Sequence, residues 1–199
     1  MSDAKKHKCT DVFLRECVEF DAAHILGAPF PVTLHGGVQE KVCMNCGGKL
    51  GHVFKKPREL AGMVAVIRAC YPLKLNGAEI KFLRKCLGLR AKELARQIEC
   101  DPAVLSRFEN DKQVITDRFE KLLRAGVLLR FNREAFVLGV DQYSIMNMSI
   151  PAAAAAPRSY CVSMSLKDDA GEIGLVGSRA LRTVGKVEWS DSCEELQAM

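Results

Sequence analysis

The chain has 199 residues and a formal charge of +5; 48% of its residues are hydrophobic and 27% are charged. These fractions are those of a folded globular protein, and the length suits one ordinary domain or two small ones. No run approaches the roughly 20 apolar residues of a membrane-spanning helix, and the polar start Met1–Lys8 lacks the apolar core of a secretory signal. The positive charge is compatible with a polyanionic partner but does not identify one. We therefore expect a cytoplasmic protein without membrane contact, whose nine cysteines are thiols or metal ligands rather than disulfides.

The sequence divides into four segments. Residues 1–58 are rich in Gly, Pro, Cys and His; 59–75 form a linking segment with apolar residues at helical spacing; 76–139 have the pattern of a helical domain; and 140–199 are an extension of unknown role. The predicted fold class is α+β, with a small β-rich zinc-ribbon-like cysteine module, an all-α domain of five helices and a small β-containing C-terminal extension.

The N-terminal module contains a pair of cysteines with tight ligand spacing. Cys43 and Cys46 are separated by two residues and followed by Gly47-Gly48, the pattern of a zinc knuckle. One knuckle supplies half of a tetrahedral zinc site. The nearest candidates for the other half are Cys9 and Cys17, ahead of the four histidines. The alternative is that the module holds no metal and that Cys9 and Cys17 are core thiols. In either case the expected role is structural.

Short extended stretches are expected at 30–34 and 38–42 of this module, and a helix is expected over 59–70. In the C-terminal extension, five alanines between the prolines of 151–157 suggest a linker. Alternating apolar and polar residues then predict a strand over 160–166, and a second strand is expected within 183–189.

The helical domain begins with a capping-box pattern, Asn76 with Glu79. A second helix is expected over 91–98. Asp101 then marks the start of a third helix, with Pro102 at its first position. Two short helices across so tight a turn make a helix-turn-helix.

The periodicity separates an inner from an outer face on these two helices. The residues expected to face the core are Leu94, Ala95, Ile98, Val104, Leu105 and Phe108. Those expected to face outward are Lys92, Arg96, Gln97, Pro102, Ala103, Ser106 and Arg107. Thr116 is expected to cap a following helix, and an apolar stretch continues over 127–136.

The sequence over 76–125 resembles the Xre/Cro family of helix-turn-helix regulators. The resemblance is carried by Gly77–Arg84, Leu87-Gly88-Leu89, Glu93-Leu94-Ala95 and Ser106–Asn110. In that family the third helix enters the major groove of DNA. The resemblance therefore implies that the DNA-contacting residues are Pro102, Ala103, Ser106, Arg107, Asn110 and Lys112, with the outward Lys92 and Arg96 beside them.

Within this set, Arg107 has the fork-shaped guanidinium that matches the O6 and N7 acceptors of guanine. Asn110 and Lys112 occupy family positions that hold a phosphate. The resemblance further implies an ion pair between Arg84 and Glu109 and a homodimer contact beyond the third helix.

Three positions depart from the family pattern. Glu99 stands where the family usually has the turn glycine, Asp111 replaces another frequent glycine, and Ala91 replaces a glutamine that often contacts phosphate. None of these changes alters Arg107 or the spacing of the helices.

The N-terminal module, in turn, resembles the YgiT-type zinc finger of the MqsA-like antitoxins. The resemblance rests on Val32–Val38 and Val42–Gly47, followed by a linking helix and a helix-turn-helix. It implies structural Zn²⁺ bound by Cys43, Cys46, Cys9 and Cys17. That family normally opens with another CxxC pair, whereas here seven residues separate Cys9 from Cys17.

The function these patterns favour is a sequence-specific transcriptional regulator that binds a double-stranded operator as a homodimer. Two alternatives stay open: an antitoxin that neutralises a protein toxin through its N-terminal module, and a thiol- or metal-responsive regulator. The sequence contains no phosphate-binding glycine loop, nucleophile elbow or HExxH pattern, so no enzymatic activity is expected.

Overall fold

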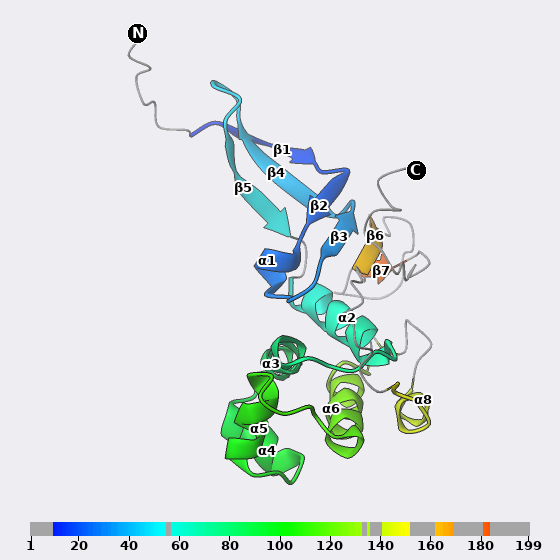
Figure 1. Cartoon of the computed structure of the whole chain (residues 1–199). Coiled ribbons are helices and arrows are strands. Elements are labelled where there is room, and N and C mark those ends of the chain that lie inside the picture. Colours follow the sequence, from blue (N-terminus) through cyan, green and yellow to red (C-terminus); the bar gives the residue numbers. More distant parts are fainter. Residues whose placement is uncertain are drawn as a thin grey trace.

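We describe a computed structural model of the chain over residues 10–54, 57–132, 135, 141–151, 162–168 and 181–183 (Figure 1). The fold is mixed α+β, as predicted. Two small sheets lie at one end, a group of helices lies at the other, and helix α2 connects them. No helix in these ranges is long and apolar enough to cross a membrane.

The first sheet is antiparallel with strand order β1-β4-β5. Its strands are β1 (Val12–Glu16), β4 (Val38–Cys43) and β5 (Lys49–Phe54). The central strand β4 includes the extended stretch expected at 38–42. Val38 and Val42 are buried, while every residue of β1 is exposed.

The second sheet has strand order β2-β3-β6-β7 and draws on both ends of the chain. Its strands are β2 (Glu19–Asp21), β3 (Val32–His35), β6 (Val162–Asp168) and β7 (Leu181–Thr183). Strand β6 pairs parallel with β3, with Val32 opposite Val162. The extension is thus joined to the N-terminal module, an association that the sequence did not predict.

The strand expected over 160–166 is confirmed as β6. Strand β7 includes Thr183, the first residue of the second expected C-terminal strand, and the rest of that range lies outside the described residues. So does nearly all of the linker expected at 151–157. A short helix, α1 (Ala23–Leu26), separates β2 from β3 and was not predicted. Asp21 Oδ1 accepts a hydrogen bond from the Ala23 N–H at its start.

The connecting helix expected over 59–70 is α2 (Pro57–Cys70). The remaining helices are α3 (Gly77–Cys86), α4 (Ala91–Gln97), α5 (Pro102–Glu109), α6 (Asp117–Arg130) and α8 (Gln142–Met146). Helix α6 packs against α2 on one side and α8 on another, and α5 packs against α3 and α4. The apolar stretch expected over 127–136 continues α6 as far as Arg130, and residues 133, 134 and 136 of it lie outside the described residues.

Two of the three expected helix caps are present. Asn76 Oδ1 accepts from the Glu79 N–H and Glu79 Oε2 accepts from the Asn76 N–H, both at 2.9 Å. Asp101 Oδ1 accepts from the Ala103 N–H at 2.6 Å. Thr116 is the N-cap residue of α6, but its side chain makes no capping hydrogen bond, so that expectation was wrong.

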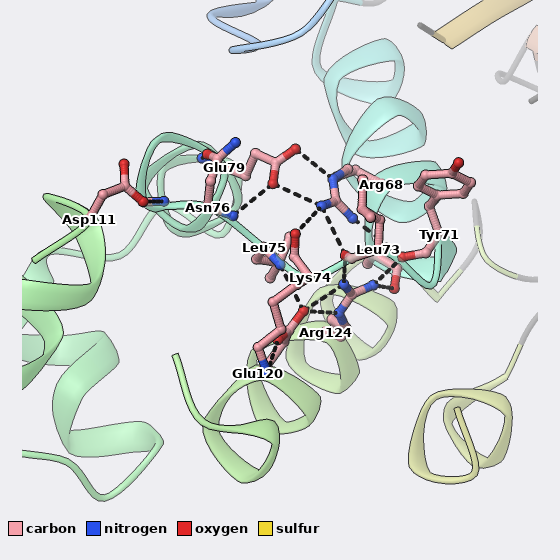
Figure 2. Close-up of polar contacts among 12 residues, drawn as sticks. Arg68, Tyr71, Leu73, Lys74, Leu75, Asn76, Glu79, Asp111, Glu120 and Arg124 are labelled. Carbon is pink, nitrogen blue, oxygen red and sulfur yellow. Dashed lines mark hydrogen bonds and ion pairs between the residues drawn. The ribbon is translucent and has the colours of Figure 1, made fainter. Parts of the chain in front are cut away.

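A buried ionic cluster fastens α2 to α3 and α6 (Figure 2). We define it as Arg68, Lys74, Glu79, Glu120 and Arg124. Arg68 donates from Nε to Glu79 Oε1 at 2.9 Å and from Nη2 to Glu79 Oε2 at 2.8 Å. Arg124 donates from Nη2 to Glu120 Oε1 at 2.7 Å. All four of these side chains are buried, and Lys74 Nζ lies 3.1 Å from Glu120 Oε2.

The same guanidinium groups also hold the chain between α2 and α3. Arg124 donates to the carbonyl oxygens of Ala69, Tyr71 and Leu73 at 2.6–2.7 Å. Arg68 donates to the carbonyls of Tyr71, Leu73 and Lys74. Because the carboxylate paired with Arg68 also caps α3, the end of α2 fixes the start of α3.

Candidate nucleic-acid interface

Helices α4 and α5 pack closely across a short connection. Ala95 is completely buried between them, and the Cys100 N–H donates to the Ala95 carbonyl at 2.9 Å. Leu94, Ile98, Leu105 and Phe108 are buried, as predicted, whereas Val104 is half-buried. A small residue at position 95 therefore allows the close approach that the sequence suggested.

The outward residues predicted on these helices are all exposed. On α5 these are Pro102, Ala103, Ser106 and Arg107, and on α4 they are Lys92, Arg96 and Gln97. The pattern follows from the helical period, since Leu105 and Phe108 occupy the opposite side of α5. The structure thus brings two basic residues of α4 and one of α5 to the surface of the same packed helix pair.

Asn110 and Lys112, which follow the exposed face of α5, make different contacts. Asn110 Nδ2 donates to the Ser106 carbonyl at 2.7 Å and lies 3.4 Å from Ser106 Oγ. The amide that the resemblance assigns to a phosphate is thus bonded to the last turn of α5. Lys112 is exposed, and its backbone N–H donates to the Arg107 carbonyl at 2.9 Å.

An ion pair anchors the end of α5 to α3. Arg84 Nε donates to Glu109 Oε1 at 2.5 Å and Arg84 Nη2 to Glu109 Oε2 at 3.1 Å. Arg84 Nη1 also donates to the Leu89 carbonyl at 2.9 Å. The side chains are only 13% and 10% exposed. The pair expected from the resemblance is therefore present, and its two parallel hydrogen bonds fix the orientation of α5.

The start of α3 also lies directly against the end of α5. A Cβ atom at Gly77 would come within 2.6 Å of the Phe108 carbonyl oxygen, so only glycine fits there. The Gly77 N–H donates to Asp111 Oδ1 at 2.6 Å. Asp111 therefore adds a contact between the two helices that a glycine at its position could not make.

The described non-glycine residues with positive φ are Glu99, at 53°, and Asp111, at 54°. These are the positions where the resemblance expects glycine. We predict that Glu99→Gly raises the free energy of unfolding by about 1 kcal/mol, because it relieves a left-handed backbone. The exposed Glu99–Arg118 contact at 3.5 Å offsets little of this gain.

The Asp111→Gly variant provides the matched comparison. It relieves less strain, because aspartate tolerates a left-handed backbone better than glutamate, and it loses the hydrogen bond to Gly77, so its stability should rise less than that of Glu99→Gly. Denaturant unfolding of both variants measures the difference. Equal gains would show that the Asp111–Gly77 bond contributes nothing to stability.

The cysteine pair lies at the far end of the first sheet. Cys43 is the last residue of β4 and is buried, whereas Cys46 is exposed in the turn before β5. The Gly48 N–H points at Cys46 Sγ, 3.4 Å away, and Gly47 has φ +67°. An amide directed at sulfur by a glycine turn is the geometry expected of a zinc knuckle.

The structure does not bring Cys17 to this turn. The Cys17 N–H donates to the Val38 carbonyl, which places Cys17 at the opposite end of β4 from Cys43. Cys43 lies five residues along β4 from Val38, roughly 17 Å at the usual rise. Cys9 lies outside the described residues, and within them no three potential ligands come together as a metal site.

The thiols of Cys70, Cys86 and Cys100 are poorly suited to a thiol-responsive role. Burial raises the pKa of Cys70 and of Cys86 to about 11. Burial, and then the charge of Asp101, raises the pKa of Cys100. Fewer thiolates at neutral pH make these cysteines slow nucleophiles. This argues against a thiol-responsive role for them.

Comparison of the chain with protein-family models, with curated proteins and with solved structures gave no match. The family resemblance therefore rests only on the residues quoted from the sequence.

Proposed function

We propose that the chain is a sequence-specific DNA-binding transcriptional regulator that acts as a homodimer, with α5 in the major groove. The observation that carries this proposal is the exposed face of α5, which presents Arg107 between small side chains while Leu105 and Phe108 anchor the helix from behind. A helix of this kind, steadied by a shorter partner across a tight turn, suits entry into a major groove.

The residues of this face have distinct roles. Arg107 donates two hydrogen bonds to a guanine edge. Ala103, one turn before Arg107, and Ser106, next to it in sequence, leave room for the base pairs to approach α5. Lys92, Arg96 and Lys112 neutralise phosphates, which makes binding steeply dependent on salt without selecting a sequence. Binding in the promoter region would repress transcription by excluding polymerase.

We predict that Arg107→Ala weakens binding to a preferred duplex by about tenfold or more. The duplex is first obtained by selecting tight binders from a random-sequence pool with the wild-type protein. Fluorescence anisotropy then compares its affinity with that of an unrelated duplex, which should change less. Lys112→Ala should weaken both duplexes alike.

Arg58→Ala is the matched control. Arg58 is an exposed arginine on the first turn of α2, and this end of α2 lies away from the helices α3 to α5. Arg58→Ala should leave the affinity for the selected duplex unchanged. If Arg107→Ala binds as tightly as the wild type, or if the selection yields no preferred sequence, α5 does not read DNA.

We also propose that Cys43 and Cys46 hold one side of a structural zinc site. The amide-to-sulfur contact of the Gly47-Gly48 turn supports this proposal. The other ligands would come from the chain ahead of Asp11, since the Met44 N–H donates to the Asp11 carbonyl beside the turn. Bound zinc would tie the N-terminal segment to the turn.

The predicted result is that purified wild-type protein carries zinc, and that Cys43→Ser and Cys46→Ser lose it. Cys17→Ser is the matched control and should keep its zinc, because Cys17 lies at the other end of β4. Elemental analysis after gel filtration gives the metal content of each variant. Zinc loss in Cys17→Ser would contradict this placement of the site.

A further inference from the structure

Strand β1 forms one edge of the first sheet, and no strand in the described ranges pairs with its outer side. Its apolar side chains are exposed: Val12 by 40%, Phe13 by 42% and Leu14 by 51%. An open edge with exposed apolar residues is a template for pairing with another strand.

The direction of the backbone groups limits the possible pairings. The Cys17 N–H points toward β4, where it donates to the Val38 carbonyl. Backbone groups alternate in direction along an antiparallel strand. The N–H and C=O groups of Val12, Leu14 and Glu16 therefore point outward, at the open edge.

The side chains around β1 are arranged so that the strand complements itself. Asp11, Val12, Phe13, Leu14 and Arg15 run acidic, apolar, aromatic, apolar, basic. If two copies lie antiparallel and centred on Phe13, each Val12 faces Leu14 of the other copy and each Asp11 faces Arg15. The residues with outward backbone groups then face each other, as hydrogen bonding requires.

Other registers of the same kind fit less well. Centring the pair on Leu14 places Arg15 opposite Phe13 and leaves Asp11 without a basic partner. Centring it on Arg15 brings two guanidinium groups together. Only the register centred on Phe13 gives opposite charges at both ends and apolar contacts between them, which are the stabilising cross-strand pairs.

Arg15 is paired within its own sheet but remains partly exposed. Its Nη2 lies 2.5 Å from Glu40 Oε2, and Lys49 Nζ lies 2.8 Å from Glu40 Oε1. The Glu40 carboxylate is buried, whereas the Arg15 side chain remains 58% exposed. Arg15 is thus held along the face of the sheet with part of its guanidinium still accessible.

We propose that two copies of the chain associate through β1, antiparallel and centred on Phe13, so that the first sheet continues from one copy into the other. This contact does not depend on DNA binding. It also lies on a different surface from the dimer contact, beyond the third helix, that the resemblance implies.

Light scattering of the full chain under reducing conditions tests the contact. The Asp11→Arg variant places two arginines opposite each other at each end of the paired strands, and Arg15→Asp places two aspartates there. Each variant alone should associate about tenfold more weakly than the wild type, because both end pairs become repulsive. An equimolar mixture of the two variants should recover the wild-type mass, because opposite charges again face each other.

Two further variants separate this contact from general effects. Leu14→Pro removes an outward N–H without removing a bond to β4, so it should reduce the mass as the charge variants do. Val18→Asp removes an apolar side chain that is 87% exposed but lies outside the strand, and should not change the mass. Circular dichroism confirms that each variant is folded. A wild-type mass for Asp11→Arg and Leu14→Pro, a monomeric wild type, or a mixture that stays dissociated overturns the proposal.

Discussion

Replacing Arg124 with methionine should lower the free energy of unfolding by about 3–5 kcal/mol, the usual cost of removing one partner from a buried ion pair. Arg124 is completely buried, and its guanidinium is bonded to Glu120 and to the carbonyl oxygens of Ala69, Tyr71 and Leu73. Methionine fills much of the volume but leaves a buried carboxylate and several carbonyls with fewer donors. An unmade hydrogen bond in the interior is more costly than a lost contact at the surface.

Denaturant unfolding followed by circular dichroism measures this loss. Arg130→Met is the matched control, because Arg130 is an exposed residue of the same helix and its replacement should change stability by less than about 0.5 kcal/mol. If Arg124→Met is as stable as Arg130→Met, the buried ionic cluster does not hold α6 in place.

The cluster also explains how α2 is attached to the helices that follow it. The segment between α2 and α3 is short, and several of its backbone carbonyls are directed at guanidinium groups, since buried carbonyls need donors. Arg68 and Arg124 supply those donors from two different helices. The N-terminal sheets are therefore connected to the candidate DNA-binding helices by a helix whose end is firmly fixed.

Local signals in the sequence predicted the helical part of the fold well. The capping box at Asn76 and the cap at Asp101 depend on residues close to each other in the chain, and both are present. The buried and exposed faces of α4 and α5 follow from the helical period. Glu99 and Asp111, identified only as departures from a glycine pattern, are the described non-glycine residues with a left-handed backbone.

Features that depend on distant parts of the chain were missed. Nothing near Arg68 or Arg124 indicates that each is buried against a glutamate, although an arginine on the apolar face of a predicted helix could have raised the question. The parallel pairing of β3 with β6 joins segments far apart in sequence. Cys17 was grouped with Cys43 because the two are near in sequence, whereas the register of β1 and β4 separates them.

The second large effect is expected at Phe108, on the side of α5 that faces away from the proposed DNA surface. Its side chain is 1% exposed, and its ring lies 6.0 Å from that of Phe119. Phe108→Ala should lower the free energy of unfolding by about 3–5 kcal/mol, since it opens a cavity behind α5. Arg107→Ala, one residue away on the exposed side, should change it by less than about 0.5 kcal/mol.

Comparing the variants at Arg107 and Phe108 distinguishes a residue that recognises DNA from one that holds α5 in place. Arg107→Ala should lose affinity for the selected duplex while unfolding like the wild type. Phe108→Ala should lose stability, and with it affinity for every duplex, because α5 is no longer held against α3 and Phe119. Phe108→Leu, which keeps most of the apolar volume, should recover much of both. The affinity of Phe108→Ala is measured under conditions in which the variant is still folded. If that affinity for the selected duplex equals the wild-type value, the orientation of α5 does not depend on Phe108.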